Sequence, residues 1–167
     1  WAAATERPSV LFLPELSERT FARFAETITA ARRDAADIAI ASIHWGGNWG
    51  YDIPAAHRDF AHRLIDEAGV DIVHGHSSHH VLGIEVYRER LVLYGCGDLL
   101  TDYEGISGHE AFRGDLGLMY FPDVDAATGR LKSLRMQPTQ VRQVRLCRPT
   151  DRDVVWLEKT LNREGRR

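Results

Sequence analysis

Four of the eight histidines lie within seven residues of one another, at His74, His76, His79 and His80. A short apolar run, residues 70–73, leads directly into them and predicts a buried strand. Neutral imidazole is a common ligand for Zn, Mn and Fe ions. The stretch is therefore a candidate for metal binding, and the alternative is a solvated loop that is merely rich in histidine.

A second histidine ends another predicted strand. Residues 37–44 (DIAIASIH) are apolar almost throughout and end at His44, and Pro54 suits the first turn of a helix to about residue 68. Strand, helix and strand over these lengths predict a parallel βαβ unit with a right-handed crossover. Both histidine-bearing segments then emerge at one edge of the sheet, about 5 Å apart if the strands are neighbours. His44, His76 and His79 are the best candidate metal ligands.

One or two divalent cations held there would activate water and neutralise developing phosphoryl charge. Such a centre also needs oxygen ligands. Asp98, beside Gly97 at the end of a predicted strand, and Asp52 are the nearby carboxylates, although a turn or capping role is the alternative for both. Residues 45–51 contain three glycines and three aromatics. Their side chains Trp45, Asn48 and Trp49 are candidates to line a substrate cleft, and packing of the aromatics onto the core is the alternative.

Other catalytic chemistries have weaker support. Ser42, Ser77 and Ser78 lie near histidines, but the sequence has no GxSxG nucleophile elbow. Cys96 lies between two glycines near the predicted site, so a Cys-His nucleophile is conceivable, and a buried, inert thiol is the alternative. No glycine-rich phosphate loop of the Walker or dinucleotide type is present.

The remaining chain predicts an α/β part followed by a mostly β part. We expect a buried strand at residues 9–13, a helix from an N-cap at Ser17 to residue 33, and a hairpin of residues 83–87 with 91–94. Strands are expected at residues 116–121 and 131–146, with Pro138 breaking the second or marking an edge, and Thr150 can cap a final helix. One domain over residues 1–167 accounts for the pattern.

The composition argues against nucleic acid as a partner and indicates a compartment. The 167 residues are 44% hydrophobic and 27% charged, with a net charge of −3, so no overall basic field indicates nucleic-acid binding. Two cysteines and no CxxC motif favour a reducing compartment, so a cytoplasmic location is slightly favoured. No run is long and apolar enough to predict a membrane span. Because the first residue is Trp1 rather than Met, we expect the chain to be part of a longer protein.

Several motifs in order carry a resemblance to a known family. These are His44-Trp45-Gly46, Gly75-His76-Ser77-Ser78-His79 and Tyr94-Gly95-Cys96-Gly97-Asp98. Together they resemble the second half of the poly-γ-glutamate capsule biosynthesis (CapA-like) family, which is similar to calcineurin-like metallophosphoesterases. The family patterns HWGxEY, GHxPH and YSxGNF fall on these segments. The sequence departs from them at several positions: among these, Asn48 and Trp49 replace Glu and Tyr, Ser78 replaces Pro, and Asp98 replaces Asn.

The resemblance implies a fold and a function. The fold is the C-terminal part of a four-layer α/β/β/α sandwich, truncated at its N-terminus. His44, His76 and His79 would hold a divalent metal (Mn, Zn or Fe), dinuclear in the full-length protein, and His76 and Asp98 would be the catalytic residues. The activity would be hydrolysis of a phosphoester within capsule synthesis, and the alternative is a non-catalytic binding or export module for an anionic polymer. The implied partners are that polymer or phosphoester and the capsule-synthesis machinery, and membrane-anchored, extracytoplasmic forms are also implied.

Overall fold

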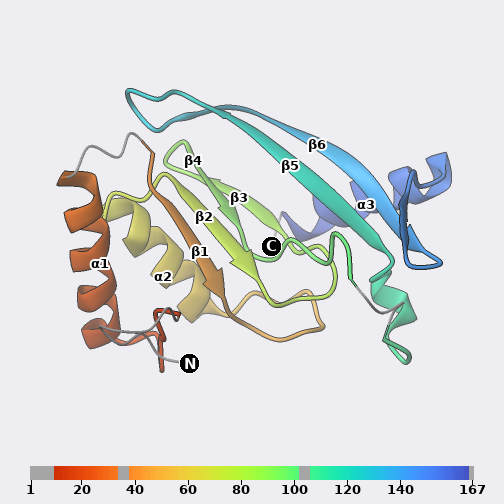
Figure 1. Ribbon diagram of the computed structural model, residues 1–167, viewed down its shortest axis with the longest axis horizontal. Helices are drawn as coiled ribbons and strands as arrows, with labels where there is room; N and C mark the ends of the chain where they lie inside the picture. The colour runs from red at the N-terminus through yellow and green to blue at the C-terminus, as the bar shows by residue number, and fades with distance from the viewer. Residues whose placement is uncertain (1–9, 34–37, 102–105, 166–167) are drawn as a thin grey trace.

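The computed structural model describes residues 10–33, 38–101 and 106–165. Three α-helices, one 3-10 helix and two β-sheets are formed by these residues (Figure 1). In chain order the elements are α1 (Glu18–Arg33), β1 (Ile40–His44), α2 (Ala55–Asp66), β2 (Ile72–His76), β3 (Ile84–Tyr87), β4 (Arg90–Leu93), η1 (Glu110–Phe112), β5 (Leu116–Val124), β6 (Leu131–Arg142), β7 (Arg145–Cys147) and α3 (Asp151–Glu164).

The first sheet has the strand order β1-β2-β4-β3. β1 pairs with β2 and β2 with β4 in parallel, whereas β3 and β4 form an antiparallel hairpin. The predicted βαβ unit, β1-α2-β2, is confirmed, and so is the predicted hairpin. Because β1 and β2 are parallel neighbours, their carboxyl ends lie side by side.

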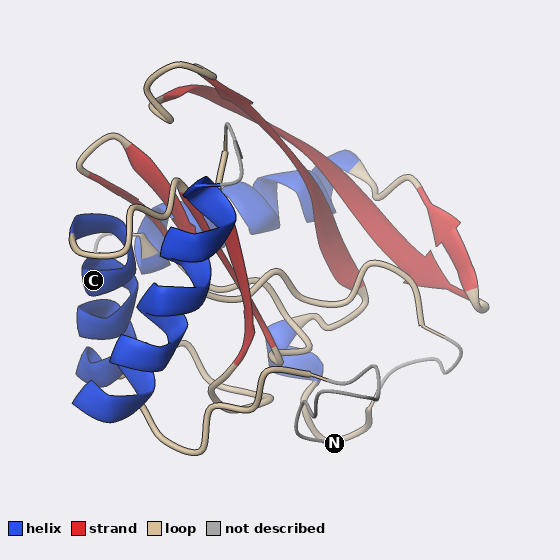
Figure 2. Cartoon of the chain, turned by 60° about the vertical axis from the view of Figure 1, so that its left-hand side comes forward, coloured by secondary structure: helices blue, strands red, loops and turns tan. Residues whose placement is uncertain are grey.

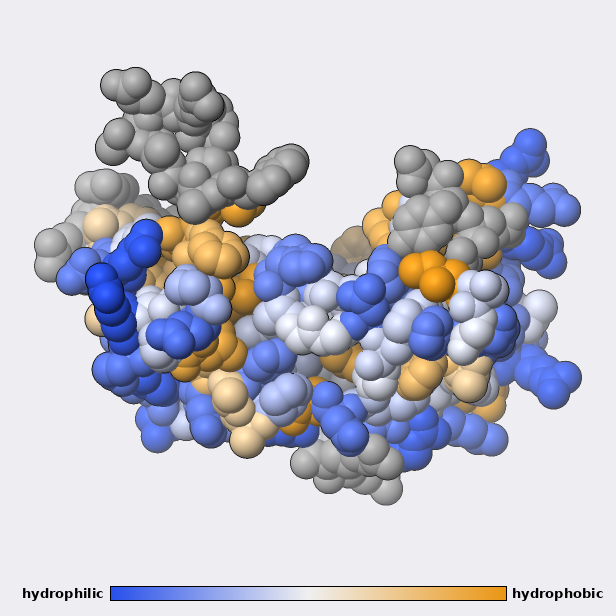
Figure 3. All heavy atoms as spheres, turned by 90° about the horizontal axis from the view of Figure 1, so that it is seen from below, coloured by the Kyte–Doolittle hydropathy of each residue, from blue (hydrophilic) through white to orange (hydrophobic). Residues whose placement is uncertain are grey.

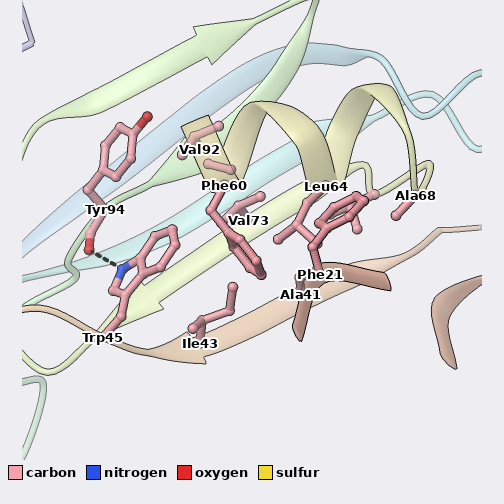
Figure 4. Close-up of a cluster of buried hydrophobic side chains, with 12 residues drawn as sticks. Phe21, Ala41, Ile43, Trp45, Phe60, Leu64, Ala68, Val73, Val92 and Tyr94 are labelled. Carbon is pink, nitrogen blue, oxygen red and sulfur yellow. Dashed lines mark hydrogen bonds between the residues drawn. The ribbon is translucent and has the colours of Figure 1, made fainter. Parts of the chain in front are cut away.

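Helices α1 and α2 cover one face of this sheet. Their amphipathic faces place Phe21 edge-on against Phe60, with ring centroids 5.9 Å apart. The predicted N-cap of α1 is present, since the Ser17 hydroxyl accepts from the Thr20 amide at 3.4 Å. Phe21 and Phe60 belong, with Leu64 and Val73, to the largest buried apolar cluster (Figure 4). That core holds β1 and β2 in place beneath the two helices.

The second sheet, β5-β6-β7, is antiparallel and lies on the other side of the first sheet (Figures 1 and 2). A buried cluster around Leu91 and Leu93 contacts Leu134 and Tyr120 of the second sheet. Helix α3 packs on β5 through Leu157 and Leu118. Its predicted cap, Thr150, forms a reciprocal capping box with Asp153. The expected α/β architecture of two sheets between helices, with βαβ before hairpins and a terminal helix, is confirmed.

The structure corrects two sequence-based predictions and decides between the alternatives given for a third. Residues 11–13 are not in a strand, and Val10 and Phe12 are more than half exposed, so an apolar run alone did not specify a buried strand there. Pro138 does not break β6, because it pairs with Leu118 within one continuous ladder, and it lies outside the β6–β7 ladder, so the alternative that it marks an edge is confirmed. β2 runs two residues beyond its ladder with β4, to His76, so His74 to His76 are strand rather than loop.

Candidate functional site

His44 and His76 are brought together by the pairing of β1 with β2. Each is the last residue of its strand, and the two are register partners. Their Nδ1 atoms are 3.3 Å apart and their ring centroids 5.1 Å. Two imidazoles on one tetrahedral cation, with metal–nitrogen bonds of about 2.0–2.1 Å, hold their nitrogens about 3.3 Å apart. The pair therefore fits the separation that two nitrogen ligands of one divalent cation require.

His74 is a neighbour of this pair that the sequence analysis did not select. It lies two residues before His76 on β2, so both side chains project from the same face of the sheet. The rings of His74 and His76 are 5.6 Å apart, and the Ser42 hydroxyl lies 2.9 Å from His74 Nδ1. If β2 had been predicted to continue to residue 76, the i, i+2 spacing of the two histidines would have placed His74 and His76 on the same face of the strand.

Burial favours the neutral form of His74 and His76, and repulsion from neighbouring imidazoles adds to this at His76. Burial lowers the pKa of His74 below its ordinary value. The pKa of His76 is lowered first by burial and then by the neighbouring His74 and His44. Neutral imidazole is the form that binds a metal ion, because protonation removes the lone pair. This cluster is therefore prepared for a cation rather than for an anion.

His79 and Asp98 form a second pair. His79 Nδ1 lies 2.9 Å from an Asp98 carboxylate oxygen, and both side chains are about one-fifth exposed. The His79 amide donates to the Asn48 carbonyl at 3.0 Å, which ties the two loops together. A carboxylate that accepts from Nδ1–H makes Nε2 the unprotonated nitrogen of the neutral ring, the arrangement typical of metal-binding histidines. Asp98 thus has the position of a residue that orients His79.

A complete metal site is not formed by the described residues. Within residues 10–33, 38–101 and 106–165, no group of three or more His, Cys, Asp or Glu side chains has the arrangement of a metal-binding cluster. The third predicted ligand, His79, is paired with Asp98 rather than grouped with His44 and His76. Asp52 is exposed on its loop.

Trp49 forms one wall of a cavity beside His79. Its ring stacks on His109 at 4.3 Å between centroids and also contacts Phe112 at 5.8 Å. The cavity has a volume of about 240 Å³, and His79, Asp98 and Arg142 contribute to its lining. Sequence analysis missed His109, Phe112 and Arg142, because only the tertiary structure brings these distant segments together.

Trp45 and Asn48, the other two predicted substrate-binding residues, are not among the residues that line this cavity. Trp45 is buried in the core, where its ring stacks on His57 at 4.8 Å and its indole nitrogen donates to the Tyr94 carbonyl at 3.0 Å (Figure 4). Packing onto the core, the alternative given above, therefore describes Trp45. The Asn48 side chain is exposed on the loop between the two tryptophans.

Two backbone features shape the loop after β2. Gly75 approaches both Trp45 and the carbonyl of Tyr94 so closely that a Cβ would overlap them. Ser77, directly after His76, has a φ of 137°, a value that non-glycine residues rarely adopt. Strained residues of this kind cluster at binding and catalytic sites.

Of the nucleophile alternatives, Ser42 lies within hydrogen-bond distance of His74, whereas Cys96 and Ser78 gain no support. Burial raises the pKa of the Cys96 thiol to about 12, so the reactive thiolate is strongly disfavoured at neutral pH. Ser78 is buried, and its hydroxyl donates to the carbonyl of His80 at 2.9 Å.

His62, which its helical position predicts to be solvated, instead lies 2.9 Å from a Glu85 oxygen and stacks on Tyr87.

Figure 3 shows the molecule from the side toward which β1 and β2 run. Hydrophilic side chains gather in its hollowed middle, between two more apolar shoulders. This polar edge is where ligands bind in α/β sheets.

Comparison with known proteins identifies the family of the chain. The profile of the family described as bacterial capsule synthesis protein PGA_cap matches residues 1–103, which include β1, α2 and β2 with both histidine pairs. The chain belongs to this capsule synthesis family. The region matched by the family profile contains His44, His76, His79 and Asp98. Arg142, which lines the cavity, lies outside that region.

Individual relatives carry names from capsule, PGA and polyglutamine synthesis. A probable polyglutamine synthesis accessory protein of Mycobacterium tuberculosis is 48% identical over 167 residues, which is all of this chain and 44% of that protein. The PGA biosynthesis protein CapA of Bacillus subtilis is 34% identical over 79 residues, or 47% of this chain and 20% of the relative. The capsule biosynthesis protein CapA of Bacillus anthracis is 25% identical over 71 residues. The chain thus spans less than half the length of these relatives.

None of the helices in the described part of the chain has the length and apolarity needed to cross a membrane.

Proposed function

We propose that this capsule synthesis family member contributes ligands to a divalent-metal site that hydrolyses a phosphoester. The observation that carries the proposal is the 3.3 Å separation of the Nδ1 atoms of His44 and His76 at the ends of two parallel strands. A divalent cation there would supply Lewis acidity, which activates water and neutralises phosphoryl charge. The accessory role in polyglutamate synthesis comes to this chain from the names of its relatives.

The chain's own residues have separate tasks in this proposal. His44 and His76 bind the cation, and His76 faces the reacting group as the catalytic residue. His79 is a further ligand, held by Asp98 through its Nδ1–H. The wall formed by Trp49 excludes water from one side of the adjoining cavity. Because the relatives are more than twice as long as this chain, the ligands that would complete a two-metal centre are proposed to lie in further sequence.

A second candidate is a non-catalytic module that binds an anionic polymer during capsule assembly. It is favoured by the cavity beside Trp49 and by the lack, within the described residues, of a three-ligand cluster. The partners in that case are the polymer and the capsule-synthesis machinery.

Metal content of the purified chain tests the first proposal. Elemental mass spectrometry after dialysis should find Zn, Mn or Fe bound to the 167-residue chain, and His44→Ala and His76→Ala should each lose most of it. A matched control is His109→Ala, which removes an imidazole from the same end of the molecule. Metal that persists in both strand variants would show that the pair is not the binding site.

Hydrolysis separates the two candidates. The full-length protein should cleave a generic phosphodiester such as bis-p-nitrophenyl phosphate, and both chelator and His76→Ala should abolish the cleavage. A full-length protein that binds metal and shows no cleavage above background would support the binding module instead.

A further inference from the structure

Positive charge is concentrated at the C-terminal end of the sequence. Residues 130–167 contain eleven Lys and Arg against four Asp and Glu, a net charge of +7, whereas residues 1–129 have a net charge of −10. The overall charge of −3 hides this asymmetry. Within this segment, β6 and β7 contain Lys132, Arg135, Arg142 and Arg145 and no carboxylate, so these two strands carry positive charge, whereas α3 has three cations and four carboxylates.

The turn between β6 and β7 pairs two arginines. Arg142 and Arg145 lie directly opposite each other in the antiparallel ladder, and both are exposed. Residues so paired have Cβ atoms about 5 Å apart, and like charges in that position repel. Among the described residues, no carboxylate lies within ion-pair distance of either guanidinium. The protein itself therefore leaves this repulsion uncompensated.

The turn that imposes this pairing is itself unfavourable. Gln143 and Val144 have φ values of 53° and 54°, in the left-handed region that favours glycine. For the β-branched Val144 this conformation is an outlier. A two-residue turn fixes the register of its hairpin, so this conformation is what sets Arg142 opposite Arg145. Strain and like-charge repulsion at one place are typical of a binding site rather than of a simple connection.

The arginine pair adjoins the cavity of the candidate site. Arg142 and Gln140 line that cavity together with Trp49 and His79. Asp115 also lines it, but its carboxylate is held by Arg113 and by the Gln140 amide. Arg142 is thus the single arginine or lysine among the described residues that line the cavity. Its positive charge favours an anionic ligand there.

Further cations lie on the segments that follow the β6–β7 turn. Arg148 follows β7, and Arg152 and Lys159 on α3 border a second groove beside Trp156. Arg152 and Lys159 have no carboxylate within ion-pair distance in the described part of the chain. Figure 3 shows hydrophilic side chains projecting from the end of the molecule that holds the β6–β7 turn. A series of cations suits an extended ligand with repeated charges better than a single small anion.

We infer that Arg142 and Arg145 form an anion-binding subsite for the carboxylates of an acidic polymer. The planar guanidinium of arginine binds carboxylates in a bidentate manner, so two opposed arginines can each hold one carboxylate of an extended chain. The bound carboxylates would offset the repulsion between the two side chains. The subsite rests on the turn and the cavity, and it holds whether or not the histidine cluster hydrolyses a phosphoester.

Binding of a labelled glutamate oligomer tests the inference. Fluorescence anisotropy with an oligomer of about 20 residues is measured in chelator and low salt, so that no metal contributes. Arg142→Gln/Arg145→Gln should weaken binding about tenfold or more, because two charge-assisted contacts are lost. The matched control Arg19→Gln/Arg135→Gln removes the same charge from α1 and from the middle of β6, and should change affinity less than about twofold. Circular dichroism verifies that all variants are folded.

Three outcomes would overturn the inference. Equal loss of affinity in both double variants would show that only net charge matters. Unchanged affinity in Arg142→Gln/Arg145→Gln would place the polymer elsewhere. Inorganic phosphate that competes as well as the oligomer, at equal charge concentration, would make the occupant a compact anion. Since chelator is present throughout, failure of the metal-site proposal leaves this result unaffected.

Discussion

Histidine has different roles at neighbouring positions of this protein, and the backbone decides which. His76 faces His44 across two strand ends, whereas His79 donates to Asp98. His80, the next residue, is buried against Tyr51 and Phe112. His74, the fourth histidine of the cluster, lies beside Ser42 and His76. The four histidines therefore have different surroundings, and a count of imidazoles in the sequence overstates the ligand set.

Two substitutions at Asp98 distinguish the effect of its hydrogen bond to His79 from the effect of its negative charge. If it orients His79 for metal binding, Asp98→Ala should weaken Zn affinity about 10- to 100-fold, whereas Asp98→Asn should retain most of it. An asparagine oxygen can still accept from His79 Nδ1–H. Zn titration with a competing chelator measures the effect. Equal weakening in both variants would indicate that the carboxylate charge, or direct coordination by Asp98, is what matters.

A buried carboxylate at the opposite end of β2 stabilises the fold. Asp71 is 4% exposed, contacts both Arg32 and Arg90, and accepts from the Ala39 amide at 3.0 Å. Asp71→Asn should lower the free energy of unfolding by about 3 kcal/mol, because both guanidiniums lose their partner. Glu67→Gln, in the exposed i, i+4 pair with Arg63, should have a much smaller effect, because solvent screens that pair. Urea denaturation compares them, and similar losses in both variants would contradict this role for Asp71.

At the scale of elements, β2 is the strand on which the site depends. It lies between β1 and β4, and its last three residues carry His74 and His76 on one face and Gly75 on the other. Gly75 lets Trp45 pack under the strand end, so the core and the histidine cluster share one short segment.

Adding a methyl group at Gly75 tests this coupling. Gly75→Ala should destabilise the protein by about 3 kcal/mol or more, because the new Cβ overlaps both an indole ring and a backbone carbonyl that cannot move independently. Gly47→Ala, in the loop after β1, meets only an ordinary contact at 3.7 Å and should change stability by less than about 1 kcal/mol. Thermal unfolding measures both. A stable Gly75→Ala would show that the strand end can shift away from Trp45.

For the whole molecule, buried neutral histidines make stability depend on pH. Burial lowers the pKa of His57 and is the largest cause of the lowered pKa of His80. Their folded pKa values lie below the unfolded value of about 6.5, so the unfolded chain binds more protons in that range. The stability they contribute is complete above about pH 6.5 and is lost as the pH falls below it.

The free energy of unfolding should therefore be lower at about pH 5.5 than at about pH 7.5. His57→Phe keeps a ring stacked on Trp45 but cannot titrate, so its stability should change less between the two pH values. Urea denaturation at both pH values gives the comparison. A wild-type protein equally stable at both, or a His57→Phe variant with the full pH dependence, would contradict this account.

The sequence by itself determined the elements around the site. Apolar runs, Pro54 and the lengths of the segments predicted the βαβ unit, and Ser17 and Thr150 predicted the starts of α1 and α3. A parallel βαβ unit places His44 and His76 at one edge of the sheet. These are local properties, or they follow from the handedness of a crossover. The same local signals were wrong for residues 11–13, since an apolar run specifies burial only when a partner surface is available.

The tertiary structure decided what surrounds that edge. The cavity combines Trp49, His79 and Asp98 with Arg142, which comes from a different sheet, and the order of the sheets is not encoded in any short pattern. It also decided that Trp45 packs in the core while Trp49 lines the cavity, although both tryptophans occupy the same loop. Burial depends on contacts between segments far apart in the chain, so it could not be determined from residue type and spacing alone.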